Sequence, residues 1–432
     1  MRPRAPPRLA GIAPRAAKSV DSPAASWHPG PTMEPPLSRR RFLQQSALAA
    51  AALVGTSRAE EVELPFANGA RRLVAFPGKR PLLVLTHRPP QLETPFAVFN
   101  EGLLTPNDAF FVRYHLSGIP TEIDPATFRL EVSGLVKTPL SLSLAELRQM
   151  EPVEVTAVNQ CSGNSRGYFN PRVNGGQLGH GAMGNARWKG VRLKDVLAKA
   201  GPAEGARQVV CNGLDAPVVP ATPDFVKALE IDHALDGEIL LAYEMNGEEL
   251  PWLNGYPLRL VVPGYFGTYW IKHLSQLSVV GETYAGFWMA SGYRIPATPG
   301  GCAEPGAAPG KTLPISQFKI RSFLTSLSEG AQVASGRDTL LRGIAFDSGA
   351  GLTEVQVSTD GGRHWEAAAL GQDLGKYSFR EWTLPWKPGA PGPAQIKCRA
   401  FNRIGETQPL EPLWNPQGYQ RNAVEAVNLQ IS

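Results

Sequence analysis

The chain has 432 residues and a formal net charge of +5, and it is 43% hydrophobic and 19% charged. This length predicts two or three domains with full hydrophobic cores. The 44 glycines and 40 prolines favour short strands and turns over long helices. The positive charge comes from residues 1–59, because residues 60–432 hold 34 basic and 36 acidic side chains. No basic stripe interleaved with aromatic residues is present, so we expect no nucleic-acid partner.

Residues 1–59 have the features of an export leader. The sequence SRRRFLQ (residues 38–44) precedes a short apolar run, and Ser57-Arg58-Ala59 provides small residues for cleavage after Ala59. The paired arginines followed by Phe-Leu predict the twin-arginine route, which exports folded proteins to the periplasm. The apolar run is shorter than the ~20 residues that span a bilayer, so we expect no membrane span. Either Met1 or Met33 is the start of the protein.

Residues 60–310 predict a mixed α+β domain without regular strand–helix alternation. The stretch from 60 to 100 is Pro-rich and irregular apart from one predicted strand. Alternating or continuous apolar runs predict the strands, and apolar residues at helical spacing predict the helices. The expected strands are 81–86, 110–115, 128–132, 140–142, 258–262 and 274–280, and the expected helices are 144–150, 191–200 and 224–229.

Residues 297–310 (ATPGGCAEPGAAPG) are almost entirely turn formers, which predicts a connection to a second domain, residues 311–432. Short alternating runs at 340–346, 352–358, 377–384 and 395–401 follow. Asp360-Gly361-Gly362 separates two such runs and predicts a hairpin. This pattern favours an all-β, immunoglobulin-like sandwich.

The four cysteines are Cys161, Cys211, Cys302 and Cys398. An even number in an exported chain suggests disulfides, yet none is in a C-x-x-C pair, so we expect no haem attached to this chain. Cys211 and Cys398 lie in apolar strand patterns typical of buried thiols, and Cys302 lies in the connection and could be free. Cys161 lies in the polar loop NQCSGNSR (159–166), where a disulfide, a nucleophile and a metal ligand all remain open.

Arg113 and His115 are separated by one residue in a predicted strand, so they face the same side and Tyr114 faces the other. Such a pair is either part of a solvated strand face or part of an anion pocket, since arginine binds oxyanions through paired N–H groups. The remaining histidines show no metal-binding spacing. The sequence contains no H-E-x-x-H, G-x-S-x-G, Walker A or G-x-G-x-x-G motif.

Several segments resemble the sulfite oxidase family and its bacterial periplasmic branch. They are TPNDAFFVRYH (105–115), CSGNSR (161–166), GAMGNARWKGVRLKDVL (181–197), LAYEMNGEELPWLNGYPLRLVVPGYFG (241–267) and WIKHL (270–274). The Asp-Gly-Gly turn at 360–362, with Trp365, resembles the C-terminal immunoglobulin-like dimerisation domain of that family. The resemblance covers about residues 85–432 and implies a molybdenum-cofactor domain followed by that sandwich.

The resemblance also implies roles for individual residues. Cys161 corresponds to the one protein thiolate that binds molybdenum, and a soft thiolate suits such a metal. Arg113 and Arg166 would face the substrate, His115 would order the pocket, and Tyr293 would bond to an oxygen ligand of the metal. Contacts to the molybdopterin would come from Phe111, Val112, Arg113, Tyr114, His115, Cys161, Asp215, Asn254, Arg259, Trp270, Ile271 and Lys272. Asn254 replaces a family histidine and Gln417 an arginine, which makes the pocket less cationic.

The implied activity is oxidation of sulfite to sulfate by oxygen-atom transfer at a molybdenum–molybdopterin cofactor. The electrons would pass to a c-type cytochrome or a haem subunit, and the chain would act as a homodimer or a heterodimer. One alternative is a sulfane dehydrogenase, which uses the same scaffold on carrier-bound sulfur. Another is a non-enzymatic exported binding protein with a sandwich module.

Overall fold

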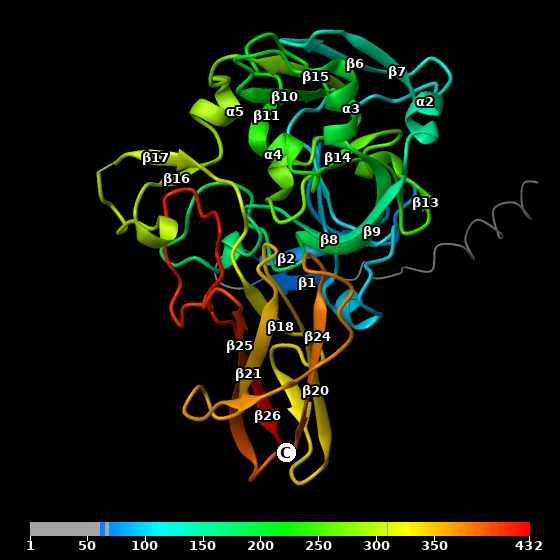
Figure 1. Ribbon diagram of the computed structural model, residues 1–432. Helices are drawn as coiled ribbons and strands as arrows, with labels where there is room; N and C mark the ends of the chain where they lie inside the picture. The colour runs from blue at the N-terminus through cyan, green and yellow to red at the C-terminus, as the bar shows by residue number, and fades with distance from the viewer. Residues whose placement is uncertain (1–60, 65–68, 309) are drawn as a thin grey trace, which may run out of the picture. The chain divides into compact units, whose positions relative to one another are not determined.

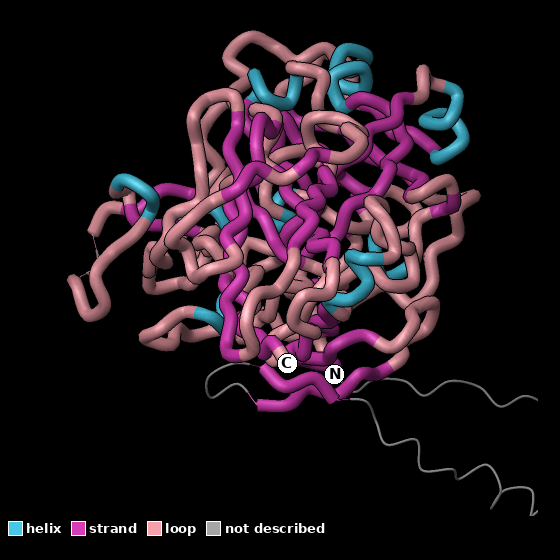
Figure 2. The backbone as a smooth tube through the Cα atoms, turned by 90° about the horizontal axis from the view of Figure 1, so that it is seen from below, coloured by secondary structure: helices cyan, strands magenta, loops and turns pink. Residues whose placement is uncertain are grey.

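The computed structural model describes residues 61–432 except 65–68 and 309. The predicted export leader therefore lies outside the described residues. Strands and loops make up most of the described chain, and the helices are few and short (Figure 2). None of the described helices is both long and apolar enough to cross a membrane.

The chain first forms a five-stranded antiparallel sheet in sequential order. Its last strand ends at Arg113, so the sheet leads directly into the predicted anion pocket. The sequence predicted its third strand, and also a strand at 110–115, of which only Val112–Arg113 is present. The other three strands are short and lie among prolines, and they were not predicted. The strands are β1 (Glu61–Leu64), β2 (Gly69–Val74), β3 (Leu82–His87), β4 (Pro90–Glu93) and β5 (Val112–Arg113).

Two further sheets form the centre of the first domain. One has the order β11-β10-β15-β6-β7, in which only β15 and β6 are parallel, and the other has the order β13-β12-β9-β8, with β14 paired to β12. Their strands are β6 (Arg129–Gly134), β7 (Leu140–Ser143), β8 (Val153–Gln160), β9 (Met183–Arg192), β10 (Gln208–Gly213), β11 (Lys227–Glu230), β12 (Leu240–Met245), β13 (Glu248–Glu249), β14 (Arg259–Val261) and β15 (Leu274–Val280). Side chains from both sheets belong to one large hydrophobic cluster, which includes the fully buried Trp188 and Trp270.

Four short α-helices in the described part of the chain pack around these sheets. They are α2 (Leu144–Gln149), α3 (Leu193–Ala200), α4 (Ile231–Leu235) and α5 (Phe287–Ala290). α2 begins with a capping box, in which the Ser143 hydroxyl accepts from the Glu146 N–H and the Glu146 carboxylate accepts from the Ser143 N–H. α3 buries Leu193, Val196, Leu197 and Ala200 on one face, which is the spacing of an amphipathic helix.

The C-terminal strands form two sheets packed face to face (Figure 1). One has the order β18-β20-β24-β23 and the other the order β19-β26-β25-β21-β22, with β19 and β26 parallel. Trp382 and Cys398 belong to the cluster buried between them. The strands are β18 (Arg321–Leu324), β19 (Ala331–Val333), β20 (Thr339–Phe346), β21 (Leu352–Ser358), β22 (Glu366–Ala367), β23 (Ala369–Leu370), β24 (Arg380–Trp386), β25 (Gly392–Asn402) and β26 (Ala426–Ile431).

The two halves of the described chain share packing. Phe323, Phe346 and Phe379, from sandwich strands and the loop before β24, belong to the large cluster of the first domain. The turn-rich residues 297–310 connect two strands that pair with each other, β16 (Arg294–Pro296) and β17 (Thr312–Pro314). The predicted boundary at 310/311 thus falls within a hairpin, and the boundary stays a prediction.

Most predicted elements of regular structure are present. The sheets described above confirm the mixed α+β domain and the sandwich. The hairpin around Asp360 is confirmed because β21 pairs with β22 across that turn. The predicted helix at 224–229 is wrong, because Lys227–Glu230 forms β11 at the edge of a sheet. Lys227, Ala228 and Leu229 are all buried, and a short apolar run buried on both faces matches a helix as well as a strand.

Candidate active site

Cys161 directly follows β8 and begins the loop that connects β8 to β9, residues 161–182, which we call the cysteine loop. Its N–H donates to the Ala182 carbonyl over 2.9 Å, so the two ends of the loop continue the β8–β9 pairing. The thiol is free, as are those of Cys211, Cys302 and Cys398. A disulfide is therefore excluded at Cys161, and Cys211 and Cys398 are buried as predicted.

Two pockets meet at Cys161. Both are lined by Arg113, Cys161, Ser162 and Tyr293. We call the first the Lys272 pocket, which encloses about 470 Å³, and the second the Arg166 pocket, which encloses about 660 Å³; both volumes include space open to solvent. The thiol thus lies where a ligand in one pocket meets a ligand in the other.

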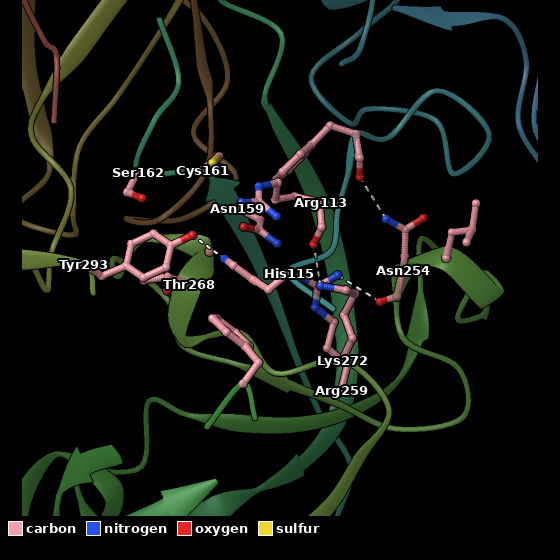
Figure 3. Close-up of a pocket in the computed structure, with 14 residues that line it drawn as sticks. Arg113, His115, Asn159, Cys161, Ser162, Asn254, Arg259, Thr268, Lys272 and Tyr293 are labelled. Atoms are coloured by element: carbon pink, nitrogen blue, oxygen red, sulfur yellow. Dashed lines mark hydrogen bonds between the residues drawn. The ribbon is translucent and has the colours of Figure 1, made fainter. Parts of the chain in front are cut away.

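The Lys272 pocket is lined by three cations, Arg113, Arg259 and Lys272, and by no carboxylate of the described chain (Figure 3). Lys272 Nζ donates to the Arg113 carbonyl over 2.7 Å, and Arg259 Nη1 donates to the Asn254 carbonyl over 2.9 Å. Burial, with the neighbouring Arg259 charge, lowers the pKa of Lys272 to about 7, and burial lowers the pKa of Arg259 to about 9. A bound anion would offset this desolvation of positive charge.

Asn254 is fixed beside these cations by hydrogen bonds on both sides of its amide. Its Nδ2 donates to the Phe111 carbonyl over 3.1 Å, and its Oδ1 accepts from Lys79 Nζ over 2.5 Å. Burial lowers the pKa of Lys79 to about 7. Lys79 is therefore a further desolvated cation, next to the pocket that Lys272 and Arg259 line. The sequence reasoning missed Lys79, which lies in the Pro-rich stretch outside every recognised motif.

Buried polar atoms without partners face the same pocket. Arg259 Nε, Ser162 Oγ, Thr268 Oγ1 and Asn159 Oδ1 have no hydrogen-bond partner, and all four residues line the Lys272 pocket. Folded proteins leave few such atoms, so four in one pocket indicate a polar ligand. Gly267 also lines it, where a Cβ atom would lie 2.3 Å from Asn159 Oδ1. The residues present therefore fit an anionic, hydrogen-bonding cofactor held close to the backbone.

Five residues predicted to contact the cofactor do not line either pocket. Val112, Tyr114, Trp270 and Ile271 are buried in the surrounding cores, and Asp215 is buried where the Lys272 charge acts on its carboxyl. Tyr114 is held by a hydrogen bond of 2.7 Å between its hydroxyl and His273 Nε2. The Tyr114 ring contacts Lys272 and the Trp270 ring contacts Arg259, and the contacts of all five residues with a cofactor stay predictions.

His115 and Tyr293 form a hydrogen-bonded pair between His115 Nε2 and the Tyr293 hydroxyl (Figure 3). The Phe225 ring lies flat against the imidazole, with ring centroids 3.6 Å apart and planes 7° apart. Burial, with the Arg113 charge and two lysine charges, lowers the pKa of His115 well below 6.5, and burial raises the pKa of Tyr293. These shifts favour the uncharged forms of both side chains, which are joined by one hydrogen bond at the pocket wall.

The Arg166 pocket combines two arginines with the thiol. Arg113 and Arg166 line it, and no described carboxylate does. Arg166 Nε donates to the Gln417 carbonyl over 3.0 Å, and its Nη1 donates to the Gly176 carbonyl over 3.2 Å. Neutral carbonyl partners orient the guanidinium without cancelling its charge, so the pocket can bind a small anion next to Cys161.

The sequence of each domain matches a known family. Residues 115–288 match the oxidoreductase molybdopterin binding domain, and residues 312–431 match the Mo-co oxidoreductase dimerisation domain. Together with the cationic pockets around one free thiol, these matches define a molybdenum oxidoreductase with a molybdopterin cofactor.

The comparison with individual proteins narrows this class. The chain is 35% identical to the mitochondrial sulfite oxidase of Rattus norvegicus over 86% of this chain and 68% of that protein. It is also 35% identical to the sulfite oxidase of Gallus gallus, over 83% and 79% of the two chains. The crystal structure of the sulfane dehydrogenase SoxCD from Paracoccus pantotrophus matches with a TM-score of 0.69 and 25% identity, over 82% and 87% of the two chains. The chain belongs to the sulfite oxidase family.

Proposed function

We propose that this chain is an exported sulfite dehydrogenase, which oxidises sulfite to sulfate by oxygen-atom transfer and delivers the electrons to a c-type cytochrome. The Arg166 pocket carries the proposal. Arg113 and Arg166 line it together with Cys161, and no described carboxylate competes for them. A small oxyanion with two negative charges is the ligand that such a pocket favours.

The Lys272 pocket would hold the molybdenum cofactor. Lys272 and Arg259 suit its phosphate, and the unpartnered Thr268 and Asn159 atoms suit its polar ring edges. Cys161 would supply the protein thiolate to the metal. The bound cofactor supplies the oxygen-atom transfer and takes up the two electrons.

The protein's own part is to bind and orient the anion. Arg113 and Arg166 would hold it beside the thiol and stabilise charge that develops on its oxygens. His115 and Tyr293 would keep a neutral hydrogen-bonding wall next to it, because burial first, and then the surrounding cations, disfavour a charged imidazole. Phe225 fixes the imidazole plane by stacking on it.

A sulfane dehydrogenase is the second candidate, and the structural similarity to SoxCD favours it. Its substrate, sulfur bound to a carrier protein, would have to reach Cys161 on an extended segment of that carrier. The two arginines of the Arg166 pocket, where no described carboxylate lies, are better explained by a free dianion than by such a segment. Membership of an oxidoreductase family argues against the third candidate, a non-enzymatic binding protein.

The decisive experiment uses protein produced in a host that assembles molybdopterin. Elemental analysis should find about one molybdenum per chain, because Cys161 is the one thiol among the described residues that lines either pocket. Steady-state reduction of a c-type cytochrome should then proceed with free sulfite and not with a persulfide on a carrier protein. Turnover of only the carrier-bound substrate would establish the second candidate, and a protein without metal that oxidises neither would refute both.

The periplasmic location and the assembly state belong to the same proposal. Replacing Arg39, Arg40 and Arg41 by lysine should retain the protein in the cytoplasm, as expected for the twin-arginine route. The C-terminal domain, which matches a dimerisation domain, would mediate a homodimer or a heterodimer with a haem subunit. Light scattering on the exported protein, with and without the cytochrome, distinguishes the two assemblies.

A further inference from the structure

Tyr419 belongs to the C-terminal half of the chain, but its side chain lines the Arg166 pocket. Its ring is stacked on the Tyr293 ring, with centroids 5.3 Å apart and planes 18° apart. The guanidinium carbon of Arg166 lies 5.0 Å from the centroid of the same ring. One aromatic side chain thus contacts two of the groups that surround the thiol.

A tight turn at residues 415–420 presents this side chain. Asn415 closes the turn, since its Oδ1 accepts from the Tyr419 N–H over 3.1 Å and its Nδ2 donates to the Tyr419 carbonyl over 2.8 Å. The Gln420 N–H donates to the Ser162 carbonyl over 3.0 Å, which ties the turn to the cysteine loop. The position of Tyr419 is therefore set by backbone contacts on both sides of it.

The same turn restrains Arg166. The Gln417 carbonyl accepts from Arg166 Nε, and the Tyr419 ring contacts the guanidinium. An aromatic face attracts a cation without neutralising it, in contrast to a carboxylate. Arg166 is in this way held in place with its charge available to a ligand.

We propose that Tyr419 is a specificity-determining residue of the anion site, through which the C-terminal domain takes part in substrate recognition. Its ring positions Arg166 and Tyr293 and forms one wall of a pocket for a small oxyanion. This inference rests on the proposed function, because the ligand of the Arg166 pocket is taken to be sulfite.

The test uses the cofactor-loaded enzyme with Tyr419 replaced by leucine, methionine or phenylalanine. Calorimetry with sulfate, a stable oxyanion of similar shape, measures anion binding without turnover, and steady-state kinetics give KM and kcat for sulfite. Tyr419→Leu and Tyr419→Met should each weaken sulfate binding and raise KM by about tenfold, with a smaller change in kcat. Tyr419→Phe should restore most of the affinity, since the ring and not the hydroxyl makes both contacts.

Tyr284→Leu is the matched control, because Tyr284 is a half-buried tyrosine that lines neither pocket. Molybdenum content and urea unfolding of every variant report on folding. Sulfate affinity and KM unchanged in the leucine and methionine variants would overturn the role of Tyr419 and leave the sulfite dehydrogenase intact. A wild-type enzyme that neither binds sulfate nor oxidises sulfite would overturn the proposed function, and this inference with it.

Discussion

Arg321, in the first strand of the sandwich, donates a hydrogen bond from Nη2 to the Ser165 hydroxyl in the cysteine loop, over 3.0 Å. The same nitrogen donates to Glu425 Oε1 over 3.0 Å, and Glu425 also pairs with Arg421. Arg321 is fully buried, and Ser165 has a φ of 68°. A left-handed residue other than glycine must be stabilised by its surroundings. The sandwich therefore helps to hold the loop that carries Cys161.

Replacing Arg321 by methionine should loosen this loop. The change removes a buried charged donor from Ser165, while Glu425 keeps its pairing with Arg421. We expect the free energy of unfolding to fall by about 1–3 kcal/mol and KM for sulfite to rise, because Arg166 directly follows Ser165. Urea unfolding and steady-state kinetics of the loaded enzyme measure the two effects.

Ser165→Ala separates the loop contact from the arginine itself. It removes the hydroxyl that Arg321 and His180 share and leaves the Arg321–Glu425 pair in place. A rise in KM in both variants would locate the effect in the Ser165 contact. Kinetics like those of the wild type in both variants would show that the cysteine loop holds its shape without the sandwich.

The sequence predicted those site residues that lie in recognisable motifs. Cys161, Arg113 and His115 meet in one pocket, as the resemblance to the family implied, although the strand that contains Arg113 ends there and His115 lies beyond it. Lys79 and Tyr419 reach the site through contacts between distant segments, and no local pattern marks them. Tyr419 lies two residues after Gln417, where the resemblance to the family implied an arginine in the pocket. Its neighbourhood was therefore indicated by the sequence, although Tyr419 itself was not.

The prediction of a helix at 224–229 was also wrong because contacts with distant segments decide the structure there. Phe225, Ala228 and Leu229 have helical spacing, yet Lys227–Glu230 pairs with β10. The side chain of Lys227 points into the core and donates to the Trp288 carbonyl over 2.7 Å. A lysine inside a buried strand is unusual, so the local sequence pattern did not indicate that residues 227–229 are buried without interruption.

Cys161→Ser should preserve the fold and abolish turnover. Serine is nearly isosteric, so we expect the free energy of unfolding to change by less than about 1 kcal/mol. The hydroxyl is a poor ligand for a soft metal, so molybdenum content and sulfite oxidation should both fall. The matched control is Cys302→Ser, whose thiol lies between β16 and β17 and lines neither pocket. Wild-type turnover in Cys161→Ser would remove this thiol as the ligand.

Gly418→Ala should displace the turn that carries Tyr419. Gly418 has a φ of 60°, and a Cβ there would lie 2.4 Å from Val173 Cγ2 and 2.8 Å from Arg166 Cγ. We expect a loss of about 1–2 kcal/mol in the free energy of unfolding from the backbone strain alone, and a higher KM because Arg166 must move. Gly405→Ala has the same kind of strain, with a φ of 82° and no atom within 4 Å of the added Cβ. Equal KM values in the two variants would contradict the close approach.

The buried Lys227 should make stability depend on pH. Burial, with the Arg294 charge, lowers its pKa from 10.5 to about 7. Between about pH 7 and 10.5 the unfolded chain therefore binds up to one proton more than the folded chain. The loss of unfolding free energy caused by burying Lys227 is greatest below pH 7 and decreases as the pH rises. Lys227→Met should flatten the rise of unfolding free energy across this window, by an amount on the order of a few kcal/mol.

Urea midpoints of the wild type and of Lys227→Met, measured from pH 6.5 to 10 on the same cofactor-loaded preparation, give this difference. Lys199→Met, on the exposed side of α3, controls for the loss of one positive charge. Identical slopes in the wild type and Lys227→Met would mean that Lys227 keeps its proton in the folded protein. Its ammonium, 5.6 Å from the centroid of the Tyr293 ring, would then add a permanent positive charge beside the His115–Tyr293 pair.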